Sequence, residues 1–307
     1  MLYDSGPGSQ RMLVFGVTSK LNLLVESHDW FMDGTFKTAP LLFEQLYTIH
    51  ALTTIGTIPC VYALLTNKQQ ATYTTLLTEL KKIEARLDPS SVMIDFEIAV
   101  INSINAVFPR AEIKGCFFHL CQNVYRKVQA LGLQQLYQND TNFAIQVRMI
   151  AALAFVPLDK VIEHFKNLQE HFIDAVSPVL DYFEDTYIGR PLRHGRRPPI
   201  FAHNLWNMYA RTDAQLPRTN NSIEGWHRSF QAGLGSYHQN FWKFLNYLIN
   251  EDAVHELRRS QLLVGQQAPP PRKRYADCNA RLLTVVRDYA QRDGLDYLRG
   301  VAYNISF

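Results

Sequence analysis

The chain has 307 residues, of which 47% are hydrophobic and 19% are charged, an ordinary globular composition with ample material for a core. Its 31 basic and 28 acidic residues leave a net charge of +3. This balance alone does not indicate a nucleic-acid-binding protein, so any such function must rest on local patches.

Cysteine usage and the N-terminal residues indicate the compartment. The four cysteines are too few and too scattered for a disulfide framework, and without a C-x-x-C pair they do not predict an internal zinc finger. The N-terminal stretch MLYDSGPGSQRMLVFG lacks the basic and apolar regions of a signal peptide. The most apolar window, Met149 to Leu158, is shorter than the ~20 residues of a membrane span. We therefore expect an intracellular protein with no membrane partner.

The first part of the chain predicts strands interleaved with helices. After an extension over residues 1–24, aromatic and β-branched runs predict strands, and apolar residues at helical spacing predict helices. The expected strands cover 30–36, 44–53, 57–66, 91–97 and 111–120, and the expected helices cover 70–87 and 98–108. With the helix that follows, the order β-β-β-α-β-α-β-α predicts an α/β fold with one mixed sheet.

From about Cys121 to Pro217 the strand signal vanishes, and we expect an all-α insertion. A basic, Pro-rich loop over 189–201 ends its helical part, and helices containing Glu224 and covering 240–263 follow. The expected parts are an N-terminal extension, the first part of the core, the insertion, the last core helices, and a Pro-rich basic linker with a C-terminal helix (276–297). Their ranges are 1–24, 25–120, 121–217, 218–265 and 266–307.

Three carboxylates occupy positions that are common for metal-binding or catalytic side chains. Asp33 closes the first predicted strand, Asp95 closes the fourth, and Glu224 opens a helix after the insertion. Buried acids at strand ends are costly unless a cation compensates them, and Mg²⁺ prefers oxygen ligands. Each acid also has a purely structural interpretation. Asp33 before Gly34 suits a turn, Asp95 suits a helix cap, and Glu224 suits an ordinary first helical turn.

Six sequence blocks, taken together and in order, resemble the MULE (Mutator-like element) transposase domain over roughly residues 25–245. The blocks are HDWFMDGTFK (28–37), FEQLYTIHAL (43–52), IPCVYALLTNKQQATYTTL (58–76), MIDFEIAVINSINAVFP (93–109), GCFFHLCQNVYRKV (115–128) and TNNSIEGWHRSF (219–230).

The resemblance implies a DDE transposase with an RNase H-like fold and an α-helical insertion before its last acid. Asp33 matches the acid of the D-G-T-F block, Asp95 that of D-x-E-x-A, and Glu224 that of N-N-x-x-E-x-W-H. These residues are then the catalytic acids and the ligands of two Mg²⁺ or Mn²⁺ ions, which cut DNA strands and join the 3′-hydroxyl to target DNA. The implied partners are transposon ends and target DNA, with a homo-oligomer in a synaptic complex.

The block GCFFH matches the C-x-x-H signature of the family through Cys116 and His119. We expect His119 just past a strand end, beside the active site, where it contacts a phosphate or a base, or else as a structural residue. Cys116 is expected to be packed. A zinc site built from Cys116, His119 and Cys121 lacks a fourth ligand at suitable spacing.

Basic residues supply candidate DNA contacts, although a solvated basic surface is the simpler explanation. The candidates are Arg190, Arg193, Arg196 and Arg197 in the Pro-rich loop, and His227 and Arg228 after Glu224. Trp226 and Phe230 share a helix face, which predicts core anchors for the insertion rather than residues that stack on bases. The short run RKR (272–274) is a weak signal for localisation to the nucleus.

The resemblance leaves alternatives to an active transposase. Members of the family usually carry an N-terminal zinc-finger-type DNA-binding domain, and no such finger is found in this sequence. A domesticated, catalytically silent DNA-binding or regulatory protein is therefore the second hypothesis. A nuclease that cuts but never joins is the third.

Overall fold

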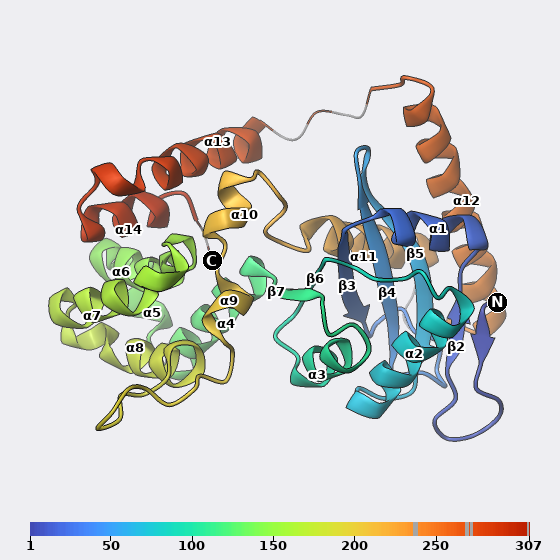
Figure 1. Cartoon of the computed structure of the whole chain (residues 1–307), viewed down its shortest axis with the longest axis horizontal. Helices are drawn as coiled ribbons and strands as arrows, with labels where there is room; N and C mark the ends of the chain where they lie inside the picture. The colour runs from blue at the N-terminus through green and yellow to red at the C-terminus, as the bar shows by residue number, and fades with distance from the viewer. Residues whose placement is uncertain (236–238, 268–269, 271–272, 306) are drawn as a thin grey trace. The chain divides into compact units, whose positions relative to one another are not determined.

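The computed structural model describes residues 1–235, 239–267, 270, 273–305 and 307 (Figure 1). The chain divides into two compact units, each built from two separate segments. The sheet unit comprises Met1–Ile113 and Asn220–Pro269, and the helical unit comprises Lys114–Thr219 and Pro270–Phe307. The helix that carries Glu224 therefore joins the same unit as Asp33 and Asp95, far from them in sequence.

The described residues form one seven-stranded sheet in the order β1-β2-β5-β4-β3-β6-β7. The strands are β1 (Tyr3–Asp4), β2 (Leu13–Phe15), β3 (Asp29–Thr35), β4 (Gln45–Thr53), β5 (Gly56–Leu65), β6 (Ser91–Ile94) and β7 (Glu112–Gly115). The pairs from β1 to β3 are antiparallel, whereas β3 and β6 are parallel. The prediction of an α/β fold with a mixed sheet is confirmed.

The hairpin of β4 and β5 is the centre of the sheet, as its apolar and β-branched residues predict. Both strands are almost wholly buried, because helices cover both faces. Thr53 pairs with Gly56 at the turn, where Gly56 has a φ of 119°, a value that favours glycine. The expected antiparallel pair is confirmed.

Among the described residues, the sheet unit has the helices α1 (Thr18–Glu26), α2 (Gln70–Ile83), α3 (Ile98–Val107), α11 (Asn221–Leu234) and α12 (Phe241–Leu263). Alternate residues of β4 point to opposite faces of the sheet. Tyr47 contacts Tyr73 of α2, with ring centroids 5.1 Å apart, whereas Leu46 joins the core beneath α11 and α12. Helix α2 and the pair α11–α12 therefore cover opposite faces.

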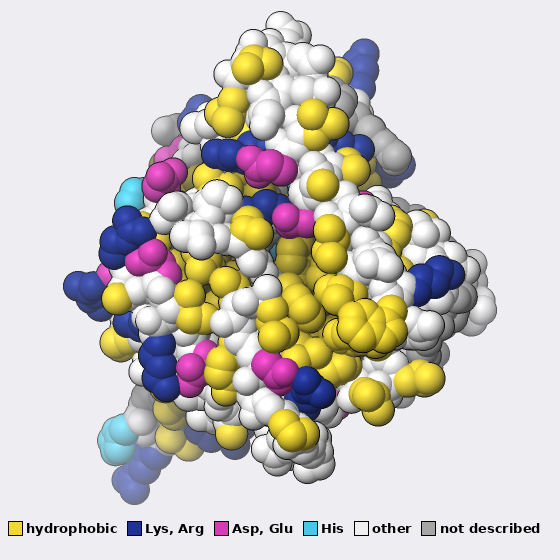
Figure 2. All heavy atoms as spheres, turned by 90° about the vertical axis from the view of Figure 1, so that its right-hand side faces the viewer, with side chains coloured by type: hydrophobic (Ala, Val, Ile, Leu, Met, Phe, Trp, Pro, Cys, Tyr) yellow, Lys and Arg dark blue, Asp and Glu magenta, His cyan; other side chains and the backbone are white. Residues whose placement is uncertain are grey.

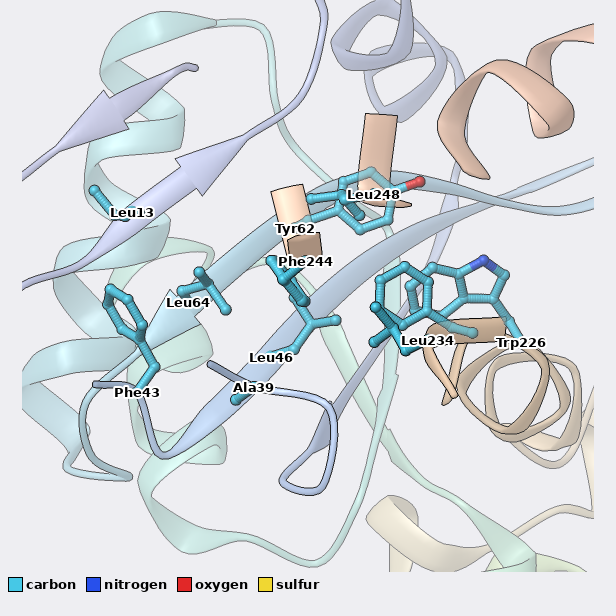
Figure 3. Packing of buried hydrophobic residues seen from close by; sticks show 11 residues of the cluster. Leu13, Ala39, Phe43, Leu46, Tyr62, Leu64, Trp226, Leu234, Phe244 and Leu248 are labelled. Atoms are coloured by element: carbon cyan, nitrogen blue, oxygen red, sulfur yellow. The ribbon is translucent and has the colours of Figure 1, made fainter. Parts of the chain in front are cut away.

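The core beneath α11 and α12 positions the helix that carries Glu224 (Figure 3). Leu46 and Tyr62 of the sheet meet Trp226 and Phe230 of α11, and the Trp226 and Phe230 rings stack with centroids 4.9 Å apart. Burying each such aromatic side chain contributes about 1.5–3 kcal/mol. The expectation that Trp226 and Phe230 are core anchors is confirmed, but the expectation that they anchor the insertion is wrong, because they pack in the core of the sheet unit.

On the side of β2 and α12, the sheet unit exposes an apolar groove of about 500 Å³. Figure 2 shows apolar side chains gathered on this side of the molecule. Phe15, Phe241 and Ile249 line the groove, and Trp242 at its edge is 69% exposed.

The helical unit contains helices of up to 15 residues among the described residues. They are α4 (Phe117–Ala130), α5 (Gln134–Asn139), α6 (Thr141–Ala152), α7 (Val161–His171), α8 (Ser177–Phe183), α9 (His203–Trp206), α10 (Tyr209–Asp213), α13 (Lys273–Arg287) and α14 (Gly294–Ala302). Helix α6 is the most buried and packs against α4, α8 and α14. Asp140 fixes its start, because its carboxylate accepts the amide hydrogens of Asn142 and Phe143 at 2.8 and 3.0 Å.

Several elements differ from the predictions. The segment expected to be an N-terminal extension contributes β1, β2 and α1 to the sheet unit. The strand predicted over 111–120 is wrong beyond Gly115, because α4 begins at Phe117. The single C-terminal helix predicted over 276–297 is also wrong. It is two helices, since the carboxylate of Asp293 accepts the amide hydrogen of Leu295 and starts α14.

Two further expectations concern localisation. No helix in the part of the chain that the structure describes is long and apolar enough to cross a membrane. In the run RKR, Lys273 and Arg274 open α13 and are exposed, whereas Arg272 lies outside the described residues.

Candidate active site

Asp33 lies within β3 and is only 8% exposed. Its Oδ1 accepts the amide hydrogen of Gly34 at 2.8 Å, and its Oδ2 lies 3.3 Å from Nδ1 of His227. The strand continues through Thr35, so Asp33 is not the turn residue of the structural alternative. A carboxylate buried at this position needs a positive or hydrogen-donating partner on each oxygen.

Asp95 directly follows β6, the strand parallel to β3. The register pairs residues 29, 30 and 31 of β3 with residues 91, 92 and 93 of β6, so that Asp33 and Asp95 each lie two residues beyond the last paired residue of their segments. Neighbouring strands are about 4.8 Å apart, and paired residues project from the same face. The N-cap position of α3 belongs to Glu97, so Asp95 does not occupy the capping position that the structural alternative gives it.

Glu224 lies in the first turn of α11. It stands in sequence between Asn220 and His227, which both contact β3. Four residues earlier, the Asn220 amide donates to the backbone oxygen of Met32 at 3.3 Å. Three residues later, His227 contacts Asp33. Residues spaced by three and four share one helix face, so Glu224 is directed toward the end of β3. The N-cap position belongs to Asn220, and the Ser222 hydroxyl bonds Oγ1 of Thr57 at 3.2 Å.

Negative charge is concentrated near the ends of β3 and β6. The pKa of the buried Tyr47 phenol lies well above its ordinary value, mainly because of burial. Tyr73 and the carboxylates of Glu97, Asp33 and Asp95 raise it further. Burial is also the main cause of the raised pKa of Glu97, and Asp95 adds to it. Carboxylates that crowd one another in this way are suited to a cation with oxygen ligands.

No group of three His, Cys, Asp or Glu side chains within the described residues is already arranged to hold a metal ion. The oxygen-donor chemistry of Asp33, Asp95 and Glu224 suits Mg²⁺ or Mn²⁺ rather than zinc. Their side chains therefore need to adjust locally for all three to bind one cation.

His227 is buried, at 8% exposed, and is not on a DNA-facing surface as the sequence predicted. Its Nδ1 faces Asp33, and its Nε2 lies 3.2 Å from Oγ1 of Thr48. Thr48 in turn lies 3.0 Å from Nε2 of His50. Sequence reasoning missed Thr48 and His50, although two polar residues within an otherwise apolar strand were a usable signal.

The C-x-x-H residues belong to the helical unit. Cys116 is buried at the N-cap position of α4, which confirms the expectation that it is packed. His119 is partly exposed and lies in the first turn of α4, so it does not follow directly after a strand as predicted. Burial raises the pKa of the Cys121 thiol well above its ordinary value, which disfavours a thiolate ligand there.

Two of the loop arginines, which the sequence offers as DNA contacts, have acidic partners in the helical unit. Arg190 bonds Asp185 at 2.7 and 2.9 Å, Asp181 at 2.9 Å and Glu184 at 3.1 Å. Arg196 bonds the other oxygen of Glu184 at 2.9 Å. The hydrogen bonds to Asp185 are the main cause that raises the pKa of Arg190. This network closes the loop onto the end of α8.

The remaining basic candidates are exposed. Arg197 makes one long ion pair with Asp185, at 3.4 Å. Arg193 and Arg228 are exposed, and no ion pair of either is found among the described residues. These three arginines, unlike Arg190 and Arg196, are available to a nucleic-acid backbone.

Comparison with known families supports the resemblance. Residues 30–123 match the model of the MULE transposase domain. This segment runs from β3 into α4 and contains Asp33, Asp95 and the C-x-x-H residues, whereas Glu224 lies outside it. No curated protein matches the chain. The match indicates a transposase-related, DNA-processing function.

Proposed function

We propose, from the match of residues 30–123 to the MULE transposase domain, that this chain is the catalytic domain of a Mutator-like DDE transposase. Its reaction is metal-dependent cleavage of a DNA strand followed by transfer of the 3′-hydroxyl to target DNA. The observation that carries the proposal is the parallel pairing of β3, which contains Asp33, with β6, which Asp95 directly follows.

The proposed fold is RNase H-like. From β3 onward, the elements follow the order β-β-β-α-β-α-β-α that the resemblance implies. A largely helical segment separates Asp95 from Glu224, as the family pattern requires. The return of α11 to the sheet unit supports a role for Glu224 together with the two aspartates.

Asp33, Asp95 and Glu224 would hold two Mg²⁺ or Mn²⁺ ions. When bound, such ions make a water or a 3′-hydroxyl more nucleophilic and stabilise the leaving oxygen. The protein holds Asp33 in place through the Gly34 amide and the His227 imidazole, and each carboxylate oxygen keeps a further lone pair for a ligand. The helix dipole of α11 favours a negative Glu224 in the first turn.

The proposed partners are transposon-end and target DNA, bound by a homo-oligomer in a synaptic complex in the nucleus. Arg193, Arg197 and Arg228 are the exposed cations suited to phosphates. His119 remains a proposed contact for DNA from the helical unit. Its partly exposed position in α4 supports this role.

The test is a cleavage assay with purified protein, Mg²⁺ or Mn²⁺, and DNA carrying the terminal sequences that flank the coding region in its genome. We expect wild type to cut and to join, and Asp95→Asn to lose at least about 10³-fold in rate, equivalent to ~4 kcal/mol. The matched control is Asp185→Asn, which changes an acid of the helical unit and retains activity.

Three results separate the hypotheses. Cleavage and joining that both depend on Asp95 support the transposase. Cleavage without joining supports the nuclease. DNA binding without cleavage under either metal contradicts the enzyme and favours the silent DNA-binding regulator.

A further inference from the structure

A line of buried polar groups runs from Asp33 into the sheet. Oδ2 of Asp33 lies 3.3 Å from Nδ1 of His227, and Nε2 of His227 lies 3.2 Å from Oγ1 of Thr48. The same Oγ1 lies 3.0 Å from Nε2 of His50. Thr48 and His50 are 0% and 1% exposed, so water does not compete for these contacts.

The sheet register places three of these residues together. Thr48 of β4 lies directly opposite Asp33 of β3, and His50 lies opposite Phe31. Residues two apart on a strand share a face, so Asp33, Thr48 and His50 all face α11. His227 of α11 lies between Asp33 and Thr48. The Trp226 and His50 rings meet edge to face, with centroids 5.6 Å apart.

The chemistry of the groups fixes the direction of each hydrogen bond. An ionised carboxylate only accepts, so Nδ1 of His227 carries the hydrogen that faces Asp33. When the imidazole carries one hydrogen, Nε2 then accepts, and the hydrogen within reach among the described residues is that of the Thr48 hydroxyl. That hydroxyl has a single hydrogen, so His50 must donate from Nε2 to the Thr48 oxygen.

Two observations support this assignment. Burial lowers the pKa of His50 well below its ordinary value, so that His50 is neutral and has one N–H to give. The Thr48 hydroxyl also lies 3.3 Å from the backbone oxygen of Asp33. Directing its hydrogen there would leave the buried Nε2 of His227 without a donor, at a cost of about 1–3 kcal/mol.

We propose that Thr48 and His50 are positioning residues of the candidate active site. They hold the His227 imidazole in the tautomer that carries its hydrogen on Nδ1. This hydrogen orients the Asp33 carboxylate for a divalent cation. The role in cation binding rests on the proposed function. Hydrogen-bond partners of metal ligands typically change metal affinity by about 10–100-fold when they are removed.

The first measurement needs no metal. In ¹⁵N NMR spectra of the metal-free protein near neutral pH, with His227 assigned by comparison with His227→Gln, we expect the hydrogen on Nδ1. Thr48→Val keeps the shape of the side chain but removes the hydroxyl, and it should abolish this preference. Thr48→Ser should restore it. A His227 hydrogen on Nε2 in wild type would overturn the inference.

The second measurement is Mn²⁺ affinity, followed by electron paramagnetic resonance. Thr48→Val should weaken binding about 10–100-fold and Thr48→Ser should recover it. The control is Thr212→Val, a buried threonine of the helical unit whose hydroxyl donates to the backbone oxygen of Met208. Wild-type affinity in Thr48→Val, with the His227 tautomer unchanged, contradicts the positioning role.

The two measurements separate failure of this inference from failure of the proposed function. A wild-type protein that binds no Mn²⁺ contradicts the metal site and with it the role of these residues in cation binding. The NMR spectra then still decide whether Thr48 and His50 fix the imidazole.

Discussion

Two buried carboxylates, one in each unit, are stabilised in different ways. Glu184 of the helical unit is 3% exposed, and the guanidinium groups of Arg190 and Arg196 each bond one of its oxygens. Asp33 of the sheet unit is 8% exposed, and its oxygens contact an imidazole and a backbone amide. The first acid is neutralised by permanent cations, whereas the second is held mainly by dipoles.

This difference separates a structural acid from a candidate ligand. A buried carboxylate that already has two arginines has no need of a further cation, and its removal takes one acidic partner from each arginine. A carboxylate held by dipoles is oriented without being fully neutralised, so an added divalent ion can still gain from binding it. The predictions below test this contrast in order of decreasing effect.

The largest effect is expected for Glu184→Gln. The substitution takes the Glu184 carboxylate from both Arg190 and Arg196. It should destabilise the protein by about 2–4 kcal/mol, which is less than the cost of breaking a fully buried ion pair because Arg190 is partly exposed. Urea unfolding, with hydrogen exchange to locate the change in α8, measures it. Mn²⁺ affinity should be unchanged, and a loss of affinity would contradict a purely structural role for Glu184.

Acidification should weaken the sheet unit through His50. Burial holds the folded-state pKa of His50 well below the ordinary 6.5, so below that pH the unfolded chain takes up a proton that the folded chain does not. Stability is therefore lost progressively as the pH falls below the ordinary pKa of histidine. Hydrogen exchange of β4 peptides at pH 7.5 and 5.5 measures this, and equal protection at both would contradict it.

The substitution Asp33→Asn should leave the metal-free protein as stable as wild type or more stable by about 1 kcal/mol, because a buried charge without a permanent cation is removed. The same variant should lose Mn²⁺ binding. Thermal unfolding with and without Mn²⁺ at about 5 mM separates the effect on stability from the effect on metal binding. Destabilisation similar to that of Glu184→Gln would show that Asp33 is structural too.

The smallest effect is expected for the exposed cation of the loop. Arg193→Ala should weaken DNA binding by less than about 1 kcal/mol, lower the salt dependence by about one phosphate contact, and leave stability unchanged. Arg196→Ala is the matched variant, and it should mainly lower stability because it removes the cation from one oxygen of the buried Glu184. Fluorescence anisotropy at several salt concentrations compares them, and equal losses of affinity would contradict the separation.

The sequence predicted what depends on local pattern. The apolar, β-branched runs of β3 to β5 gave their extents within one or two residues, and the spacing of Trp226 and Phe230 revealed the buried face of α11. The error after Gly115 arose because a short apolar run such as CFFHL fits a strand and a buried helix equally well.

Contacts between distant segments could not be predicted in this way. Thr48 and His227 are 179 positions apart, and their hydrogen bond depends on how α11 returns to the sheet. The ion pairs of Arg190 and Arg196 also depend on a loop folding back onto α8, so a basic sequence run looked like a DNA contact. The two aspartates were proposed because strand ends are positions where ligands commonly gather, although β3 continues for two residues beyond Asp33.

The most direct test of the central claim is anomalous diffraction from crystals of the protein soaked in Mn²⁺. The account predicts an anomalous peak about 2.0–2.2 Å from carboxylate oxygens of both Asp33 and Asp95, with Glu224 reaching the same site. No peak should appear at Glu184, where arginines already occupy both oxygens. Manganese bound only elsewhere, with Asp33 still bonded to His227 and Asp95 turned away, would contradict it.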